Sequence, residues 1–268
     1  MRSLIPIFLF MPIALAPFSS CTDKNGSAVI QDKQEYSITD QRVIGDHLSE
    51  FMKTSKQDFG VLNANAHPEA YEYLGMMMKS AVVTEQVALR EDFNWEIIPV
   101  VNRQEKFAYS MPGGKVVIST GMLHYLQNES ELLALLSSEI YFTDVDIHTT
   151  ALRDEFSGIR MGSLALGNED ESTDLIEFLE KQRIDEAHVM QSDIRAVSVM
   201  CPFNYDIRSI KSLIERTKSG KDMLVWSERR PRPQDWEDQY LSEMNRCDNT
   251  SAQKFRSRYQ EFLDLLPR

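Results

Sequence analysis

The pattern of apolar and polar residues predicts a small β-sheet in the first part of the stretch from residue 94 to residue 148. Runs of β-branched and aromatic residues favour three short strands, at residues 95–101, 106–110 and 115–120. The sequence Met-Pro-Gly-Gly at residues 111–114 separates the last two runs and is typical of a tight turn. We therefore expect an antiparallel sheet of about three strands.

A long helix is predicted after these strands. Asn128 and Glu131 form a capping-box pattern at its start. Apolar residues then recur at helical spacing, at Leu132, Leu133, Leu135, Leu136 and Ile140. We expect this helix, which carries Ser138 and Glu139, to pack beside the sheet.

Most of the remaining chain is predicted to be helical. The spacing of apolar residues favours helices at about 40–57, 68–90, 149–167, 175–200, 235–245 and 251–265, and another that ends near residue 218. The acidic stretch 168–174 has the composition of a linker, and the Pro- and Arg-rich segment from Trp226 to Trp236 that of a solvated loop. The predicted fold class is therefore α+β and mainly helical.

Length and charge narrow the class of protein. The chain has 268 residues, of which 42% are hydrophobic, enough for one domain with a good-sized core. Its 41 acidic and 29 basic residues give a formal net charge of -12. Because such a chain repels phosphate backbones, we expect no nucleic-acid partner.

The first 21 residues have the pattern of an export signal. Arg2 precedes an apolar run from Leu4 to Phe18, which three prolines interrupt and which is too short to span a membrane comfortably. The run ends in Ser-Ser-Cys and resembles a bacterial lipobox, in which Cys21 is acylated, although Phe18 replaces the usual leucine. An ordinary secretory signal and an uncleaved anchor are the alternatives.

These patterns divide the chain into a lipoprotein-type signal peptide at 1–20, a flexible tether at 21–39 and a folded domain at 40–268. Lipid on Cys21 would attach the domain to a membrane, so we expect a location in the bacterial cell envelope, facing the periplasm. Cys201 and Cys247 then form an even pair in a compartment that permits disulfides, with buried free thiols as the alternative.

The order of the motifs in the central part of the sequence is more specific than any single motif. A strand, a Pro-Gly-Gly turn, a second strand, Thr-Gly-Met-Leu and the helix ESELLALLSSEI follow one another. This order resembles the HtpX-like and CAAX-prenyl-protease-like zinc metallopeptidases, peptidase family 48, over residues 93–148 and more weakly over 175–216. The resemblance implies a zincin-like domain, in which an HExxH motif on the long helix supplies two zinc ligands and a glutamate base.

The chain departs from this family at the metal ligands. Ser138 and Phe142 stand at the two His positions, and Glu139 stands at the position of the base. The third ligand position, which opens the family's later ExxAD motif, falls on Val189, while Asp193 keeps the motif's Asp, which lies behind the metal ligands. The resemblance therefore implies a vestigial metal site with an inactive base, and we expect no metal and no other cofactor.

Other polar groups make a weaker case for catalysis. The candidates for a rearranged zinc site are Glu139, Asp144, His148 and His188. No two histidines of the chain are three or four residues apart, so no pair with HExxH-like spacing exists elsewhere in the sequence. Ser137 and Ser138 adjoin Glu139, but no GxSxG motif accompanies them, and we interpret them as packing residues.

The resemblance also implies where a partner binds. In the family, the strand after the turn borders the substrate cleft, so we expect an extended polypeptide to pair with Pro112, Gly113, Gly114, Lys115, Val116, Val117 and Ile118. The expected function is that of a catalytically inactive envelope lipoprotein that binds a polypeptide or an assembly partner in the former substrate cleft. The alternative is an active metalloendopeptidase of the protein quality control type, with zinc in a rearranged site.

Overall fold

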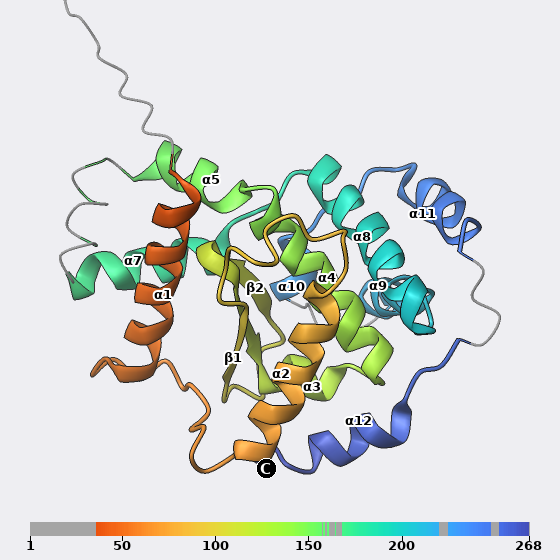
Figure 1. The fold of residues 1–268 in the computed structure, drawn as a ribbon, viewed down its shortest axis with the longest axis horizontal. Coiled ribbons are helices and arrows are strands. Elements are labelled where there is room, and N and C mark those ends of the chain that lie inside the picture. The colour runs from red at the N-terminus through yellow and green to blue at the C-terminus, as the bar shows by residue number, and fades with distance from the viewer. Residues whose placement is uncertain are drawn as a thin grey trace, which may run out of the picture. The chain divides into compact units, whose positions relative to one another are not determined.

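The computed structural model describes residues 36–156, 158, 160, 164, 168–219, 225–247 and 252–267 (Figure 1). The predicted signal peptide, Cys21 and most of the predicted tether lie outside the described residues. Among the described helices, none has the length and apolar character needed to cross a membrane. Helix α1 (Ile38–Thr54) begins at a Ser37 and Asp40 capping box, so residues 38 and 39 belong to the folded domain.

The sheet has three strands, β1 (Glu96–Val100), β2 (Ala108–Met111) and β3 (Lys115–Ser119), in the order β1-β3-β2. Strands β2 and β3 are antiparallel around the short helix η1 (Pro112–Gly114), as predicted. Gly113 and Gly114 have φ angles of 70° and 84°, which only glycine adopts easily, so this turn depends on both. Strand β1 runs parallel to β3, which makes the sheet mixed rather than wholly antiparallel.

The predicted pairing of a polypeptide with residues 112–118 is wrong in one respect. Strand β3 is the central strand, because Val117 pairs with Ile98 on one side and with Tyr109 on the other. All of its residues are buried. The prediction failed because the hairpin and the parallel pairing occupy both edges of this strand, and no edge is left for β-augmentation.

Helix α4 (Glu129–Asp144) begins at Asn128, whose side chain accepts a hydrogen bond from the Glu131 backbone, as predicted. It is buried along almost its whole length, because helices pack around it on several sides. These are α2 (Pro68–Val82), α8 (Glu186–Met200), α9 (Ser209–Ser219) and α12 (Arg256–Leu263). The remaining short elements are α3 (Thr120–Tyr125), α5 (Ile147–Glu155), η2 (Cys201–Phe203), α10 (Val225–Glu228) and α11 (Trp236–Met244).

The two faces of the sheet belong to two apolar cores. Ala108, Val116 and Ile118 pack in the core that contains α4. Tyr109 and Val117, their strand neighbours, point the opposite way into a second core formed with α1 and α7 (Glu169–Lys181). The general fold class predicted from the sequence, α+β and mainly helical with a small sheet beside a long helix, is confirmed.

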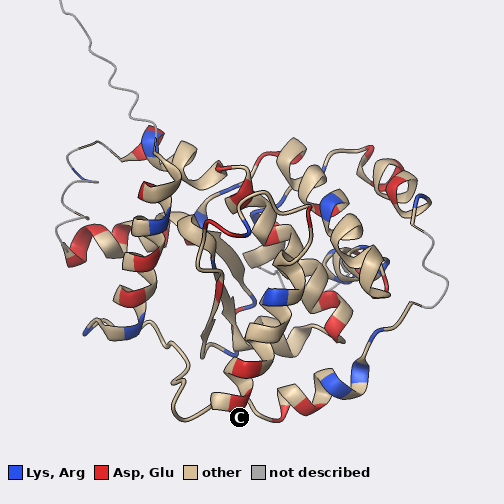
Figure 2. Cartoon of the chain, viewed as in Figure 1, with Lys and Arg blue, Asp and Glu red and all other residues tan. Residues whose placement is uncertain are grey.

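Helix boundaries differ from the prediction in the acidic region. The stretch 168–174 is the start of α7, not a linker, because the Asn168 side chain accepts hydrogen bonds from the Asp170 and Glu171 backbones. Acidic residues are favourable in that first turn, because it carries the positive end of the helix dipole. Figure 2 shows α7 with acidic residues in red. The predicted helix 175–200 is two helices, and the second is capped by Asp185.

Candidate functional site

The five residues that the resemblance assigns to a former metal site meet between α4 and α8. Ser138, Glu139, Phe142, Val189 and Asp193 are each at most 1% exposed. The Ser138 hydroxyl lies 2.9 Å from Ser192 Oγ and 3.2 Å from Asp193 Oδ1. Phe142 and Val189 pack together in a small apolar cluster of their own. The alignment of these positions on two different helices therefore corresponds to proximity in space.

A buried arginine lies between these side chains. Arg230, 1% exposed, donates a hydrogen bond of 2.8 Å from Nη1 to Glu139 Oε1. Its Nη2 lies 2.7 Å from Ser192 Oγ and 3.1 Å from Asp193 Oδ1, and also contacts Ser138 Oγ. The guanidinium carbon is 4.9 Å from the centre of the Phe142 ring. The Arg230 guanidinium thus contacts the side chains at both expected His positions, the glutamate at the position of the base and the retained aspartate.

Two tryptophans and a second arginine complete this cluster. Trp226 Nε1 donates to Glu139 Oε1 at 3.0 Å, and its ring lies 4.8 Å from the Arg230 guanidinium carbon. Asp193 Oδ2 accepts from Arg232 Nε at 2.8 Å and from Trp236 Nε1 at 3.0 Å. Each carboxylate therefore has at least two charged or polar donors, as burial of a carboxylate requires.

The segment from Trp226 to Trp236 supplies all these donors, so its prediction as a solvated loop is wrong. Trp226 is fully buried and Trp236 is 4% exposed. Sequence reasoning missed the role of Arg230. The available signal was the unusual density of Trp and Arg around two prolines, opposite a Glu and an Asp on helices that the resemblance already brought together.

Arg229 anchors the same segment to the sheet. Its guanidinium donates hydrogen bonds of 3.0 Å each to the carbonyl oxygens of Ala108, Leu179 and Gln182. Burial lowers the pKa of Arg229, and the positive charge of Arg230 acts in the same direction. Arg230 and Arg232 thus pair with the two carboxylates, whereas Arg229 binds only carbonyl oxygens and adds a third buried positive charge beside them.

A buried Ser-His pair adjoins Glu139. Ser110 Oγ lies 2.8 Å from His148 Nε2 and donates a hydrogen bond of 3.2 Å to Glu139 Oε2. The other ring nitrogen of His148 lies 2.9 Å from Gln182 Oε1. Burial lowers the pKa of His148 to about 4, so its ring is neutral at neutral pH. Ser110 is fully buried and His148 is 1% exposed, so this pair joins β2 to α5 and has no access for a substrate.

The candidates for a rearranged zinc site have separate partners. His148 is held as just described, and His188 contacts the Asp185 carboxylate at the start of α8. Asp144 pairs with Arg195 and accepts backbone hydrogen bonds from Ala88 and Leu89. Within the described part of the chain, no group of three His, Cys, Asp or Glu residues is placed to hold a metal ion.

The residues at the former metal position do not fit zinc. A zinc site needs several nitrogen, sulfur or carboxylate ligands around one point. Ser138, Phe142 and Val189 offer one hydroxyl among them, and the guanidinium of Arg230 touches that hydroxyl. A divalent cation here would replace or oppose a positive charge that is already paired with both carboxylates.

Away from this cluster, Cys201 and Cys247 form a disulfide, with 6.0 Å between their Cα atoms. The bond joins η2, which follows α8, to the turn after α11. The pairing predicted from the even cysteine count is therefore present in the structure.

Comparison with known proteins agrees with this geometry. Residues 53–141 match the model of peptidase family M48, a stretch that includes α2, the sheet, α3 and most of α4. No curated protein matches the chain. The match contains Ser138 and Glu139 and ends before Phe142, so Arg230 and the rest of its cluster lie beyond it. Over residues 53–141 the chain is therefore similar to peptidase family M48.

Proposed function

We propose that this protein uses an M48-like scaffold to bind a polypeptide or an assembly partner, and that it does not cleave peptide bonds by zinc chemistry. The observation that carries the proposal is the position of Arg230, in contact with Ser138, Glu139, Asp193 and the face of Phe142. In the M48-like arrangement these positions surround the metal.

The chemistry of the cluster supports the absence of zinc-dependent activity. A metallopeptidase glutamate acts as a base by taking a proton from metal-bound water. Here the Glu139 carboxylate is fully engaged by Arg230, Trp226 and Ser110. A structural zinc ion contributes on the order of 10 kcal/mol only with its complete ligand set. A carboxylate held as the counter-ion of a buried arginine is a poor base, and the described residues place no such ligand set around it.

The rearranged active site, which was the alternative, receives less support. Its candidate ligands Asp144, His148 and His188 each bind different neighbours, which are Arg195, Ser110 and Asp185. A ligand set would require several of these contacts to break together. We therefore retain the binding function as the proposal.

The location of the protein is part of the same proposal. Residues 1–21 have the sequence pattern of a lipoprotein signal that ends at Cys21. Lipid on Cys21 would hold the domain at a membrane of the cell envelope. Mass spectrometry of the protein from its native membrane should detect an acylated N-terminal cysteine, and an intact Met1 would contradict this part.

The function is tested with purified protein and a labelled unfolded substrate such as casein. We expect less than a tenth of an equivalent of zinc after purification, no chelator-sensitive hydrolysis, and saturable binding of labelled casein by fluorescence anisotropy. A Glu139→Gln variant is the matched control, since it removes the base at almost unchanged side-chain volume. Because it also removes a charge from the buried pair with Arg230, circular dichroism checks that it is folded. Hydrolysis that zinc chelators and this variant both abolish would contradict the proposal.

A further inference from the structure

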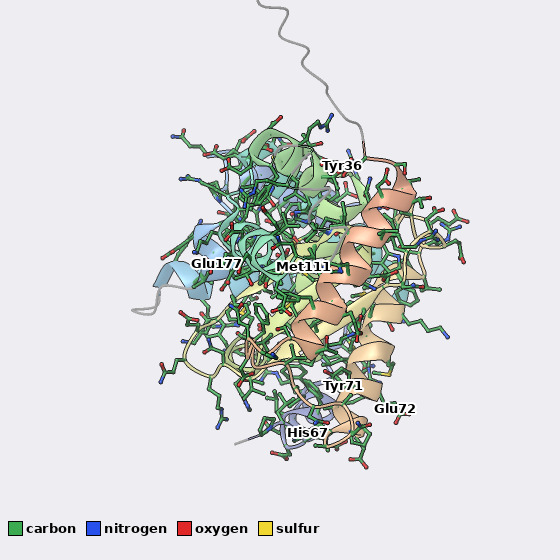
Figure 3. The ribbon with its side chains drawn as sticks, turned by 90° about the vertical axis from the view of Figure 1, so that its left-hand side faces the viewer. Tyr36, His67, Tyr71, Glu72, Met111 and Glu177 are labelled. Atoms are coloured by element: carbon green, nitrogen blue, oxygen red, sulfur yellow. A yellow bond between two sulfur atoms is a disulfide. The ribbon has the colours of Figure 1, made fainter. Side chains whose placement is uncertain are left out.

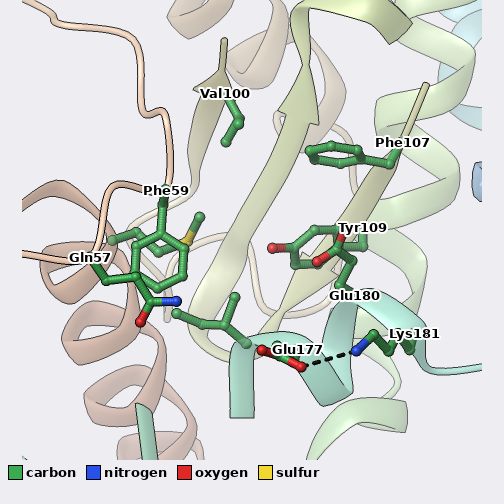
Figure 4. A pocket seen from close by; sticks show the side chains of 10 residues that line it. Gln57, Phe59, Val100, Phe107, Tyr109, Glu177, Glu180 and Lys181 are labelled. Carbon is green, nitrogen blue, oxygen red and sulfur yellow. Dashed lines mark hydrogen bonds and ion pairs between the residues drawn. The ribbon is translucent and has the colours of Figure 1, made fainter. Parts of the chain in front are cut away.

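A cavity of about 300 Å³ lies on the side of the sheet that faces away from the Arg230 cluster (Figure 4). Its walls are the end of α1, strands β1 and β2, and helix α7. Ser110 points from β2 toward Glu139, so its strand neighbour Tyr109 points from the other face into this cavity. The cavity is therefore separate from the former metal site.

The hydroxyl of Tyr109 faces the cavity without a protein partner. The Tyr109 side chain is 2% exposed, and its hydroxyl has no hydrogen bond to any described residue. The hydroxyl oxygen itself is open to the cavity, since it is not among the fully buried polar atoms without a partner. Figure 4 shows this hydroxyl directed into the space between β2 and Phe59. A ligand or water in the cavity would satisfy it.

Glu180 supplies a second unpaired polar group in the same cavity. It is half-buried, and no described cation lies within ion-pair distance of its carboxylate. Burial raises the pKa of Glu180, and the negative charge of Glu105 adds to the effect. Arg229 lies beneath Tyr109, but its guanidinium is committed to three carbonyl oxygens. Lys181 and Arg229 act on the Glu180 carboxylate electrostatically, but neither forms an ion pair with it.

The other walls of the cavity suit the stem of a basic side chain. Phe59, Phe107 and Tyr109 present aromatic rings, and Met52 and Ile176 present aliphatic surface. Aromatic faces attract ammonium and guanidinium groups, and aliphatic walls pack against methylene stems. The rim is polar and exposed, because Glu177 and Lys181 pair there at 3.0 Å.

We propose that this cavity binds a lysine or arginine side chain of a polypeptide. The ammonium or guanidinium would pair with Glu180 and bond to the Tyr109 hydroxyl, while its stem lies against the aromatic walls. The polypeptide backbone would remain outside, along the exposed rim. The inference takes the polypeptide partner from the proposed function and gives it a site, but it does not depend on whether the protein cleaves peptides.

The test is isothermal titration calorimetry at pH 7.5 with blocked tripeptides of glycine, a central residue and glycine. The central residue is lysine, arginine or norleucine, which has an aliphatic stem of similar shape to lysine but no charge. We expect the lysine and arginine peptides to bind at least ten-fold more tightly than the norleucine peptide. Equal affinities would overturn the proposal, as would tighter binding of free butylamine than of the lysine peptide.

Two variants locate the binding. Glu180→Gln should weaken binding of the lysine peptide by ten-fold or more, and Tyr109→Phe by about three-fold, which corresponds to one weak hydrogen bond. Glu72→Gln is the control of equal charge change, since Glu72 is exposed on α2 and lies well away from Glu177 in Figure 3. An effect of Glu72→Gln as large as that of Glu180→Gln would show only general attraction to an acidic protein and would overturn the site.

The variants should keep their fold, because neither the Glu180 carboxylate nor the Tyr109 hydroxyl makes a hydrogen bond to another described residue. Should either variant unfold, the unmodified protein still tests the proposal through NMR. Titration with the lysine peptide should then shift the backbone amide signals of residues 107–109 and 176–181. Shifts confined to residues outside the cavity walls would contradict the assignment.

Discussion

Arg230 Nη1 lies 2.8 Å from Glu139 Oε1, and both side chains are 1% exposed. The same guanidinium reaches Asp193 at 3.1 Å, so one buried cation joins α4, α8 and the segment after α10. A buried ion pair of this kind need not stabilise a protein compared with an apolar replacement of the whole cluster. Its effect becomes large when one member alone is removed.

Replacing Arg230 alone should therefore be strongly destabilising. Arg230→Met keeps much of the side-chain volume but leaves the Glu139 and Asp193 carboxylates buried without that partner. We expect a loss of about 3 to 5 kcal/mol in the free energy of unfolding, measured by urea denaturation. Arg246→Met is the control, because Arg246 pairs with Glu243 while 74% exposed, and should cost less than about 1 kcal/mol. Equal losses would contradict a special role for Arg230.

The positive charge of Arg230 should also decide whether zinc ligands can be restored. We expect the variant with Ser138→His, Phe142→His and Val189→Glu to bind zinc weakly, because the guanidinium still opposes the ion. Adding Arg230→Ala should raise zinc affinity at least 100-fold in calorimetric titrations. Circular dichroism of both variants checks that they are folded. Equal zinc affinity in the two would show that Arg230 does not control the site.

The neutral state of His148 predicts a loss of stability in mild acid. Its pKa is lowered from 6.5 to about 4 in the folded protein, so the unfolded chain binds the proton first as pH falls. The stabilisation is present above pH 6.5 and is lost between pH 6.5 and about 4, by up to roughly 3 kcal/mol.

The check for His148 is urea denaturation of the native chain and of His148→Gln at several pH values. The difference in stability between them should shrink as the pH falls from 6.5 toward 4. A constant difference across this range would mean that His148 titrates alike in the folded and unfolded states.

The contact between α1 and the Pro-Gly-Gly turn predicts opposite effects for two glycine substitutions. A Cβ at Gly45 would lie 2.0 Å from the Pro112 carbonyl oxygen, whereas one at Gly75 would meet nothing within 4 Å. Gly45→Ala should therefore destabilise by about 1 to 3 kcal/mol. Gly75→Ala should stabilise by about 0.5 to 1 kcal/mol, because alanine favours a helix. Thermal unfolding measures both, and a stabilising Gly45→Ala would contradict this packing.

The disulfide should stabilise the protein by restricting the conformations of the unfolded chain. Cys201 and Cys247 are 46 residues apart, for which chain entropy predicts about 4 kcal/mol. The variant with both cysteines changed to alanine should lose stability of this order in urea denaturation. A reducing agent should destabilise the native chain similarly and leave the variant unchanged. Sensitivity of the variant to reduction would point to another cause.

The sequence predicted the parts of the fold that local patterns determine. The turn at Pro112 to Gly114, the cap at Asn128 and the helical leucines led to the correct hairpin and long helix. The parallel pairing of β1 could not be predicted, because it depends on which edge of β3 remains free after the hairpin forms. Because β1 pairs with that edge of β3, the edge expected to bind a polypeptide is not free.

The vestigial site was predicted in part. The resemblance placed Ser138, Glu139, Phe142, Val189 and Asp193 together, and the structure brings them into contact. Arg230 was missed because arginine in a proline-rich segment is usually solvated, and only the tertiary position of the two carboxylates makes its burial favourable. The cavity at Tyr109 was missed as well, since its walls come from four elements that are distant in the sequence.

The most direct test of the central claim is X-ray diffraction at the zinc absorption edge from crystals of the unmodified protein grown with zinc. We expect no anomalous peak between Ser138, Glu139, Phe142 and Val189, and density for the Arg230 guanidinium in that place. A zinc peak there, with Arg230 turned away from Glu139, would contradict it.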